Sequence, residues 1–191
     1  MKTLQRPLGV LALLTLITAF VLWMQEPPTP VAASAPTDVF SAERAMAHVR
    51  EIARAPHPPG TPEHDRVRDY LVAEFQKLGF TTTVQKRVAH RTERDGDLRL
   101  ASVENIIAEK PGSAPTGTLL LAAHYDSHFS GPGAGDDAAG VAALLEAMRA
   151  LGSTPHKNTL RILITDAEEF GLLGAQEIGR ASCRERVSVL V

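Results

Sequence analysis

The chain has 191 residues, enough for one domain with a sizeable hydrophobic core. Hydrophobic residues make up 44% of it and charged residues 22%, a balance that argues against wholesale disorder. The formal net charge is −2, and no basic stripe with interleaved aromatic residues occurs, so we expect no nucleic-acid partner. Cys183 is the only cysteine in the sequence, which excludes an internal disulfide bond and a thiolate zinc site.

An uncharged apolar run over residues 8–24 follows Lys2 and Arg6. About 17 residues is the short end of the range that crosses a bilayer as a helix. The positive flank favours a cytoplasmic N-terminus, which places the later residues on the extracytoplasmic or lumenal side. We therefore predict a membrane anchor over 1–26 that contacts lipid through 8–24. A cleaved signal peptide is the alternative, with Ala33-Ser34-Ala35 as a small-residue cleavage site.

Residues 27–40 are rich in proline, alanine, serine and threonine, a composition that predicts a semi-extended linker. Two helices are expected after the linker. Ser41 is placed to cap the first helix, and Thr61 is placed to cap the second. Pro62 suits the first position of the second helix, and Gly79 is expected to end it.

The residue pattern changes after Gly79 from helical spacing to strands. Runs rich in β-branched residues predict strands over 81–88 and 103–108. The charged stretch 91–97 between them predicts a connection.

Two continuous apolar runs, 118–124 and 159–165, are typical of strands buried on both faces. The segment 141–151 between them has helical spacing. This alternation predicts an α/β fold, a three-layer α/β/α sandwich with a mostly parallel mixed central sheet. The strands that should follow 174 are missing from this sequence, so we expect 159–165 to leave an unpaired edge.

Three short polar stretches stand at the ends of these strands or in the following loops, where open α/β sheets place their active sites. They are AHYDSH (123–128), GAGDDAAG (133–140) and DAEEFGLLG (166–174). Singly, each has a structural explanation: a surface histidine, a helix cap or a solvated acidic loop. Together they supply one imidazole and several carboxylates, a donor set suited to zinc or a similar divalent ion.

Other site motifs do not fit this sequence. Gly133, Gly135 and Ala138 match a dinucleotide fingerprint, but Asp136 and Asp137 would repel the pyrophosphate. The sequence has no G-x-S-x-G elbow and no H-E-x-x-H helix. These absences disfavour a serine hydrolase and a one-zinc metalloprotease of that kind.

The three stretches together resemble those of the co-catalytic two-zinc aminopeptidases related to bacterial leucyl aminopeptidase and glutamate carboxypeptidase. The run ARAPHPPGTPEH (53–64) is similar to the membrane-bound branch of this family, which includes endoplasmic-reticulum metallopeptidases and vacuolar membrane proteases. The resemblance covers 41–176. It implies a zinc metallopeptidase, in the first place an aminopeptidase, that hydrolyses peptides with a free N-terminus.

The resemblance also implies residue roles. His124 would bind one zinc ion, Glu169 would bind the other, and Asp136 would bridge the two. Asp126 would orient the imidazole of His124, and Glu168 would be the general base that takes a proton from the attacking water. The two zinc ions would activate that water and stabilise the tetrahedral oxyanion.

The sequence departs from the family in its ligand count. The family uses a further Asp and a further His downstream of Glu169, but no Asp follows Asp166 and no His follows His156. Each zinc ion would keep two protein ligands, one fewer than the usual catalytic minimum of three. We therefore expect 41–176 to be the N-terminal part of a longer peptidase domain, inactive as written.

Residues 177–191 resemble a translated sequencing adapter, and we expect them to be a non-native tail; a natural polar segment is the alternative. Two other functions stay open. A non-catalytic binding ectodomain of the same fold is disfavoured because Glu168 is retained beside Asp136 and Glu169. An aminoacyl cyclase would use the same site, and these motifs do not separate it from a peptidase.

Overall fold

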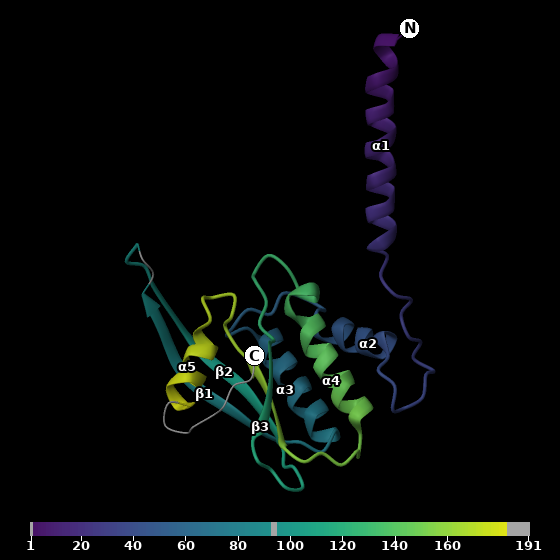
Figure 1. Cartoon of the computed structure of the whole chain (residues 1–191). Helices are drawn as coiled ribbons and strands as arrows, with labels where there is room; N and C mark the ends of the chain where they lie inside the picture. The colour runs from purple at the N-terminus through teal and green to yellow at the C-terminus, as the bar shows by residue number, and fades with distance from the viewer. Residues whose placement is uncertain (1, 93–94, 183–191) are drawn as a thin grey trace. The chain divides into compact units, whose positions relative to one another are not determined.

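The computed structural model describes residues 2–92 and 95–182 (Figure 1). The chain divides into two units, one up to Pro30 and one from Val31 onward. The first unit holds α1 (Lys2–Met24), in which Pro7–Met24 is long and apolar enough to cross a membrane. A signal sequence near the N-terminus can have the same length and apolar composition. Cys183 and the rest of 183–191 lie outside the described residues.

Two helices of the second unit begin at capping residues that the sequence marks. Ser41 caps α2 (Ala42–Ile52), because its Oγ accepts a hydrogen bond from Arg44 N at 3.3 Å. Thr61 caps α3 (Pro62–Lys77) in the same way, accepting from His64 N at 3.3 Å. Both predicted caps are confirmed. Helix α4 (Ala139–Leu151) follows the second polar stretch.

The four strands form one sheet in the order β1-β2-β4-β3. The β1–β2 and β2–β4 pairs are antiparallel, and the β3–β4 pair is parallel. The predicted mixed sheet is confirmed, but its parallel share among the described strands is smaller than the pattern predicts, because β1 and β2 are joined as a hairpin. The strands are β1 (Thr81–Thr92), β2 (Leu98–Lys110), β3 (Thr118–His124) and β4 (Thr159–Thr165).

The position of β4 differs from the prediction. An unpaired edge is predicted at 159–165, yet β4 lies between β2 and β3 and pairs with both. Within the described sheet β1 and β3 lie at the margins, and β3 has several half-exposed residues instead of burial on both faces. The apolar content of a strand predicts burial. It does not reveal on which side the next strand joins.

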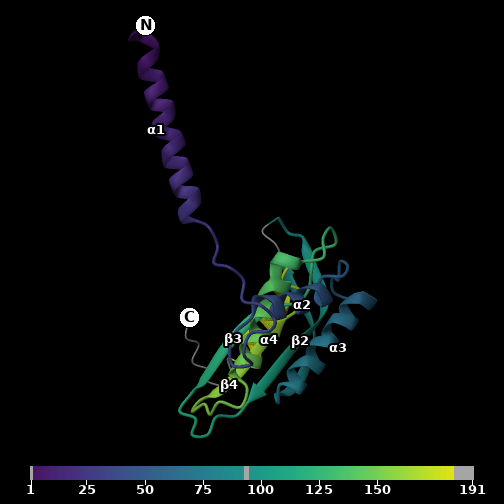
Figure 2. The ribbon, with the colours of Figure 1, turned by 90° about the vertical axis from the view of Figure 1, so that its right-hand side faces the viewer.

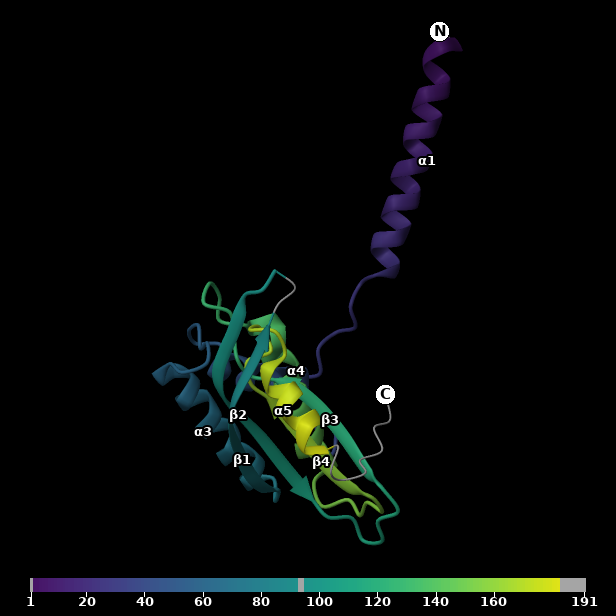
Figure 3. The same cartoon turned by 90° about the vertical axis from the view of Figure 1, so that its left-hand side faces the viewer.

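Helices cover both faces of the sheet. Helices α2, α3 and α4 lie on one face (Figure 2), and α5 (Leu173–Ser182) lies on the other (Figure 3). Alternate residues of β2 show the division, because Ile106 and Ala108 belong to the core under α3 and α4, whereas Val103 packs with Leu173 of α5. The three-layer α/β/α arrangement is confirmed. Helix α5 also includes 177–182, the first part of the predicted tail.

Part of the predicted linker 27–40 is bound to the domain. Arg44 Nη2 and Arg149 Nη2 donate to the carbonyl oxygen of Val39 at 2.6 and 3.0 Å. The buried carboxylate of Glu146 holds both arginines, accepting from Arg44 Nε at 3.0 Å and from Arg149 Nη2 at 2.8 Å. The segment before α2 is therefore an ordered extension of the domain.

Glu146 generates a prediction about stability. Burial raises the pKa of its carboxyl, but hydrogen bonds from Arg149, the Ser41 N–H and Arg44 outweigh burial and lower the pKa to about 2. Glu146→Gln removes this counter-charge, so the free energy of unfolding at pH 7 should fall by about 2–4 kcal/mol. Denaturant titration of the wild type and the variant measures the difference.

The pH dependence of that difference has a definite sign. The folded pKa of Glu146 lies below its ordinary value of 4.5, so its stabilisation is complete above that value and is lost as pH falls toward 2. The gap between wild type and variant should therefore narrow at pH 2.5. Glu109→Gln, which removes a surface pair with Arg161, is the control and should cost at most about 1 kcal/mol. Equal losses in the two variants would contradict the prediction.

Candidate metal centre

The three polar stretches meet at one edge of the sheet. Strands β3 and β4 are parallel neighbours, with His124 in register with Thr165 at their carboxyl ends. The turn η1 (Ala134–Ala138) lies between β3 and α4, and the acidic turn 166–169 directly follows β4. Segments far apart in the sequence are thus brought to the same edge.

His124 and Asp136 point at each other. The ring of His124 is buried, and its Nε2 lies 3.0 Å from Asp136 Oδ1. Glu168 Oε2 lies 3.9 Å from the same nitrogen. The Asp136 side chain is 84% exposed, so the open side of this cluster faces solvent.

Asp126 joins the two strand ends. Its fully buried carboxylate lies 3.4 Å from His124 Nδ1, through Oδ1. Oδ1 also accepts a hydrogen bond from Glu168 N at 2.9 Å, and Oδ2 accepts one from Glu169 N at 3.2 Å. His124 Nδ1 is also within hydrogen-bond distance of the Asp126 carbonyl oxygen, at 3.2 Å. Asp126 therefore contacts the imidazole on one strand end through its carbonyl oxygen and its carboxylate, and the carboxylate also holds the backbone of the acidic turn on the other strand end.

Asp137 has a structural part in the site that the sequence pattern does not reveal. Its carboxylate accepts from the backbone N–H of His124 at 3.3 Å and from that of Gly140 at 3.0 Å. A Cβ at position 140 would collide with this carboxylate, so a larger residue there would displace the Asp137 side chain. Paired aspartates before a helix are the available signal, but spacing alone does not distinguish Asp137 from Asp136.

The acidic turn has further supports that the sequence pattern does not reveal, namely Asp166, His64 and Asn105. Asp166 and His64 form a buried pair, with 2.8 Å between Oδ1 and Nε2. Asn105 Oδ1 accepts from Asp166 N at 3.0 Å. The sequence offers no signal for Asn105, because a polar residue inside a strand is ordinarily assigned to the solvent face.

A comparison with known families decides the assignment. The sequence profile described as Peptidase family M28 matches residues 105–191, a stretch that contains all five candidate site residues. The part of the chain that carries the candidate site thus matches peptidase family M28. The match runs across 177–191 as well, the segment for which the adapter-like sequence predicts a non-native origin.

Curated relatives agree with this family. The chain is 34% identical to the vacuolar membrane protease of Candida albicans over 134 residues, 70% of this chain and 16% of that protein. It is 32% identical to leupeptin-inactivating enzyme 1 of Streptomyces exfoliatus over 187 residues, 88% of this chain and 40% of that protein. The chain thus spans well under half the length of these two relatives.

Solved structures share the fold of this chain. Porphyromonas gingivalis glutaminyl cyclase matches with a TM-score of 0.62 and 32% identity, over 74% of this chain and 53% of that one. A Bacteroides vulgatus protein described as a candidate zinc-dependent exopeptidase matches with a TM-score of 0.60 and 27% identity, over 78% and 56%.

The donor set of the M28 site fits a metal ion in part. Two ligands at ordinary zinc distances in tetrahedral geometry stand about 3.4 Å apart. The 3.0 Å separation of His124 Nε2 and Asp136 Oδ1 is close to that value. However, no group of three or more His, Cys, Asp or Glu residues in the described ranges is arranged around a common metal position. The contact of Glu169 with the site is through its backbone, because the Glu169 N–H donates to the Asp126 carboxylate.

The electrostatics of the M28 site follow from its carboxylates. Burial lowers the pKa of His124, but hydrogen bonds to Asp126 and Asp136 and the charge of Glu168 outweigh it and raise the pKa to about 9. Burial raises the pKa of Glu168, and the neighbouring carboxylates add to this effect against the opposing charge of His124. The imidazole is therefore protonated near neutral pH until a metal ion competes for Nε2.

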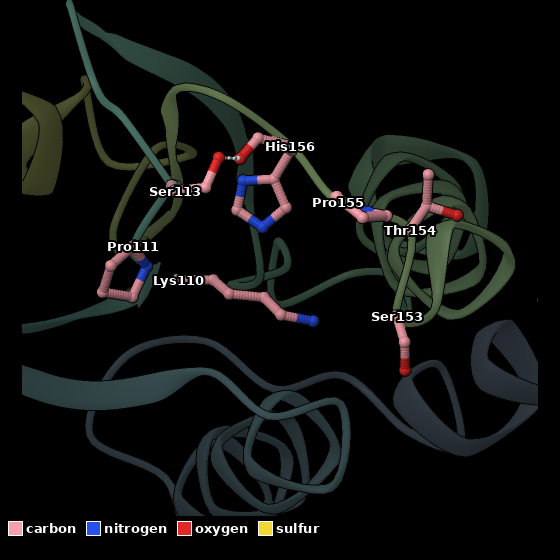
Figure 4. Close-up of a pocket in the computed structure, with 8 residues that line it drawn as sticks. Lys110, Pro111, Ser113, Ser153, Thr154, Pro155 and His156 are labelled. Carbon is pink, nitrogen blue, oxygen red and sulfur yellow. Dashed lines mark hydrogen bonds between the residues drawn. The ribbon is translucent and has the colours of Figure 1, made fainter.

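A separate pocket lies at the opposite end of the sheet. It has a volume of about 250 Å³ and is lined by the end of β2 and the loop before β4. Figure 4 shows Lys110, Ser113 and His156 around it, with the Ser113 hydroxyl donating to the carbonyl oxygen of His156. No candidate site residue lines this pocket.

Asp126→Asn tests the electrostatic part of this site. Removing the negative charge should lower the pKa of His124 from about 9 by at least about one unit, toward the ordinary 6.5. NMR titration of the imidazole in the metal-free chain measures the pKa. Asp137→Asn is the matched control, because that carboxylate bonds to the backbone N–H of His124. A pKa of about 9 in Asp126→Asn would show that Asp126 does not set it.

Proposed function

We propose that this protein is a membrane-anchored, zinc-dependent exopeptidase, acting mainly as an aminopeptidase. The observation that carries the proposal is the position of Asp126, which ties the imidazole of His124 to the Glu168–Glu169 turn beside Asp136. A histidine oriented by a buried carboxylate is the usual arrangement of a metal-binding imidazole. The peptidase names of the M28 relatives agree with this activity.

We assign His124, Asp136 and Glu169 as metal ligands of a two-zinc site, with Asp136 shared by both ions. Bound zinc would supply a Lewis acid that lowers the pKa of water and polarises the scissile carbonyl. With Asp136 shared, the chain gives each ion two ligands, whereas catalytic zinc generally has three. We therefore propose that an Asp and a His outside these 191 residues complete the site.

Glu168 is the proposed general base. Its side chain is 37% exposed and 3.9 Å from His124 Nε2, so it reaches the open side of the site. The pKa of Glu168 is raised toward neutral pH. A general base with such a pKa can accept a proton from water and return it to the leaving amine. Asp126 keeps this residue in place through the Glu168 N–H.

Helix α1 is the proposed anchor. Its apolar segment is long enough to span a bilayer, and Lys2 and Arg6 precede it. Positive residues at this end favour a cytoplasmic N-terminus, which puts the peptidase unit on the extracytoplasmic or lumenal side. The vacuolar membrane protease relatives agree with attachment to a membrane.

Aminoacyl cyclisation is the second candidate, favoured by the match to glutaminyl cyclase. A peptide with an N-terminal glutamine separates the two reactions. An aminopeptidase releases free glutamine, whereas a cyclase releases ammonia and leaves the peptide bond intact. Mass spectrometry of the products identifies the reaction.

Glu168→Gln tests the assigned base in a protein that contains the complete site. Glutamine keeps the shape but accepts no proton, so turnover of an aminoacyl substrate should fall by about 10²–10⁴-fold. Zinc content, measured by elemental analysis, should stay unchanged, since Glu168 is not an assigned ligand. Glu109→Gln, at the other end of the sheet, should keep full activity. Near-normal turnover of Glu168→Gln would remove this residue from the mechanism.

A further inference from the structure

A buried histidine outside the assigned site touches both segments that carry it. His64 lies in the first turn of α3 and is 2% exposed. Its Nε2 is 2.8 Å from Asp166 Oδ1, at the base of the acidic turn. Its ring stacks on Tyr125 with 4.7 Å between ring centroids, and Tyr125 stands between His124 and Asp126. None of the assigned chemical steps uses His64.

Asp166 is the point through which this histidine reaches the acidic turn. Its Oδ1 also accepts from Ala167 N at 2.7 Å, and its Oδ2 accepts from Glu104 N at 2.7 Å. Ala167, which precedes Glu168, has a φ of 53°, a left-handed conformation that a non-glycine residue adopts only where its surroundings hold it. The hydrogen bonds of Asp166 supply that support.

Asn105 closes the other end of the same turn. Its Oδ1 accepts from Asp166 N, and its Nδ2 donates to the Gly174 carbonyl oxygen at 3.0 Å. A Cβ at Gly174 would collide with Asn105 Oδ1 and with the Asp166 carbonyl oxygen. The side chain of Asn105 in β2 therefore forms hydrogen bonds with both ends of the turn from 166 to 174.

Tyr125 completes the connection to β3. Its hydroxyl donates to the Glu104 carbonyl oxygen at 3.0 Å, and its backbone N–H donates to Thr165 O at 3.1 Å. The ring on which His64 stacks is thus fixed to both β2 and β4. Because the ring cannot shift alone, His64 holds a defined position between Tyr125 and Asp166.

We propose that His64 is a positioning residue that fixes the spacing between 124–126 and the turn 166–169. It does so by donating Nε2–H to Asp166 while its ring packs on Tyr125. The consequence for zinc rests on the proposed function, because the segments positioned are those that carry the assigned ligands. The consequence for the turn itself does not need a metal ion.

Two substitutions separate the hydrogen bond from the ring packing. His64→Phe keeps a flat ring for Tyr125 but leaves Asp166 without its side-chain donor. His64→Gln restores a donor of similar reach and gives up the ring. His48→Phe is the matched control, because His48 also pairs with a tyrosine, at 2.6 Å from the Tyr70 hydroxyl, but lies in α2 away from the turn.

Amide hydrogen exchange of the metal-free full chain in detergent micelles is the primary measurement. We expect His64→Phe to speed exchange at Glu168 N and Glu169 N by about tenfold or more relative to Leu145 in α4, and His64→Gln to restore most of the protection. In a protein that contains the complete site, calorimetric titration with zinc alone should show about 10–100-fold weaker binding in His64→Phe. His48→Phe should leave both quantities unchanged.

A uniform rise in exchange at Glu168, Glu169 and Leu145 in His64→Phe would overturn the proposal, because it would indicate general destabilisation. So would the same selective rise in His48→Phe. If His64→Phe does not fold, His64→Asn replaces it, since the shorter amide reaches less far toward Asp166, and the same outcomes apply. A wild-type protein that contains the complete site and binds no zinc would contradict the proposed function, while the exchange data would still decide the role of His64.

Discussion

The buried carboxylate of Asp126 is the constraint on which the site depends. A buried ionised carboxylate is costly unless hydrogen-bond donors surround it. Here the donors are the backbone N–H groups of Glu168 and Glu169, and the imidazole of His124 lies within ion-pair distance. The same contacts that stabilise the charge therefore assemble the site. Losing one partner would leave the carboxylate less satisfied and release the segment that the partner belongs to.

The sheet makes this contact possible. Because β3 and β4 are parallel neighbours, their carboxyl ends lie side by side and the residues that follow them meet. Position within the sheet matters as well. Strand β4 is central and well packed, and the acidic turn directly follows it. Asn105 and Glu104 of β2 form hydrogen bonds with Asp166 at the start of that turn. Both neighbours of β4 therefore contribute to the site: β3 leads into 124–126, and β2 supports the acidic turn.

Much of the site follows from the sequence alone. The composition of the three polar stretches predicts a nitrogen ligand and carboxylates at adjoining strand ends, and the structure brings His124, Asp126, Asp136 and the backbone of the Glu168–Glu169 turn together there. The helix caps at Ser41 and Thr61 follow from local chemistry, which acts within a few residues. Local patterns carry this information well.

Long-range partners are what the sequence does not reveal. The local sequence around His64 or Asn105 does not indicate that their side chains contact Asp166, because these contacts span 102 and 61 positions. The same applies to Glu146, whose pairing with Arg44 turns the end of a predicted linker into part of the domain. The order of strands is a further case. An apolar run shows that a strand is buried, but pairing on either side depends on the whole sheet.

The assignment of His124 as a metal ligand is tested most directly by X-ray absorption at the zinc edge on the zinc-loaded full chain. We expect nitrogen and oxygen neighbours at about 2.0–2.1 Å, the distances of imidazole and carboxylate ligands. The outer-shell signal of the imidazole ring should weaken in His124→Ala and persist in His128→Ala, which removes an exposed histidine of the same stretch. A spectrum that His124→Ala leaves unchanged, or that shows sulfur from Cys183, would contradict the assignment.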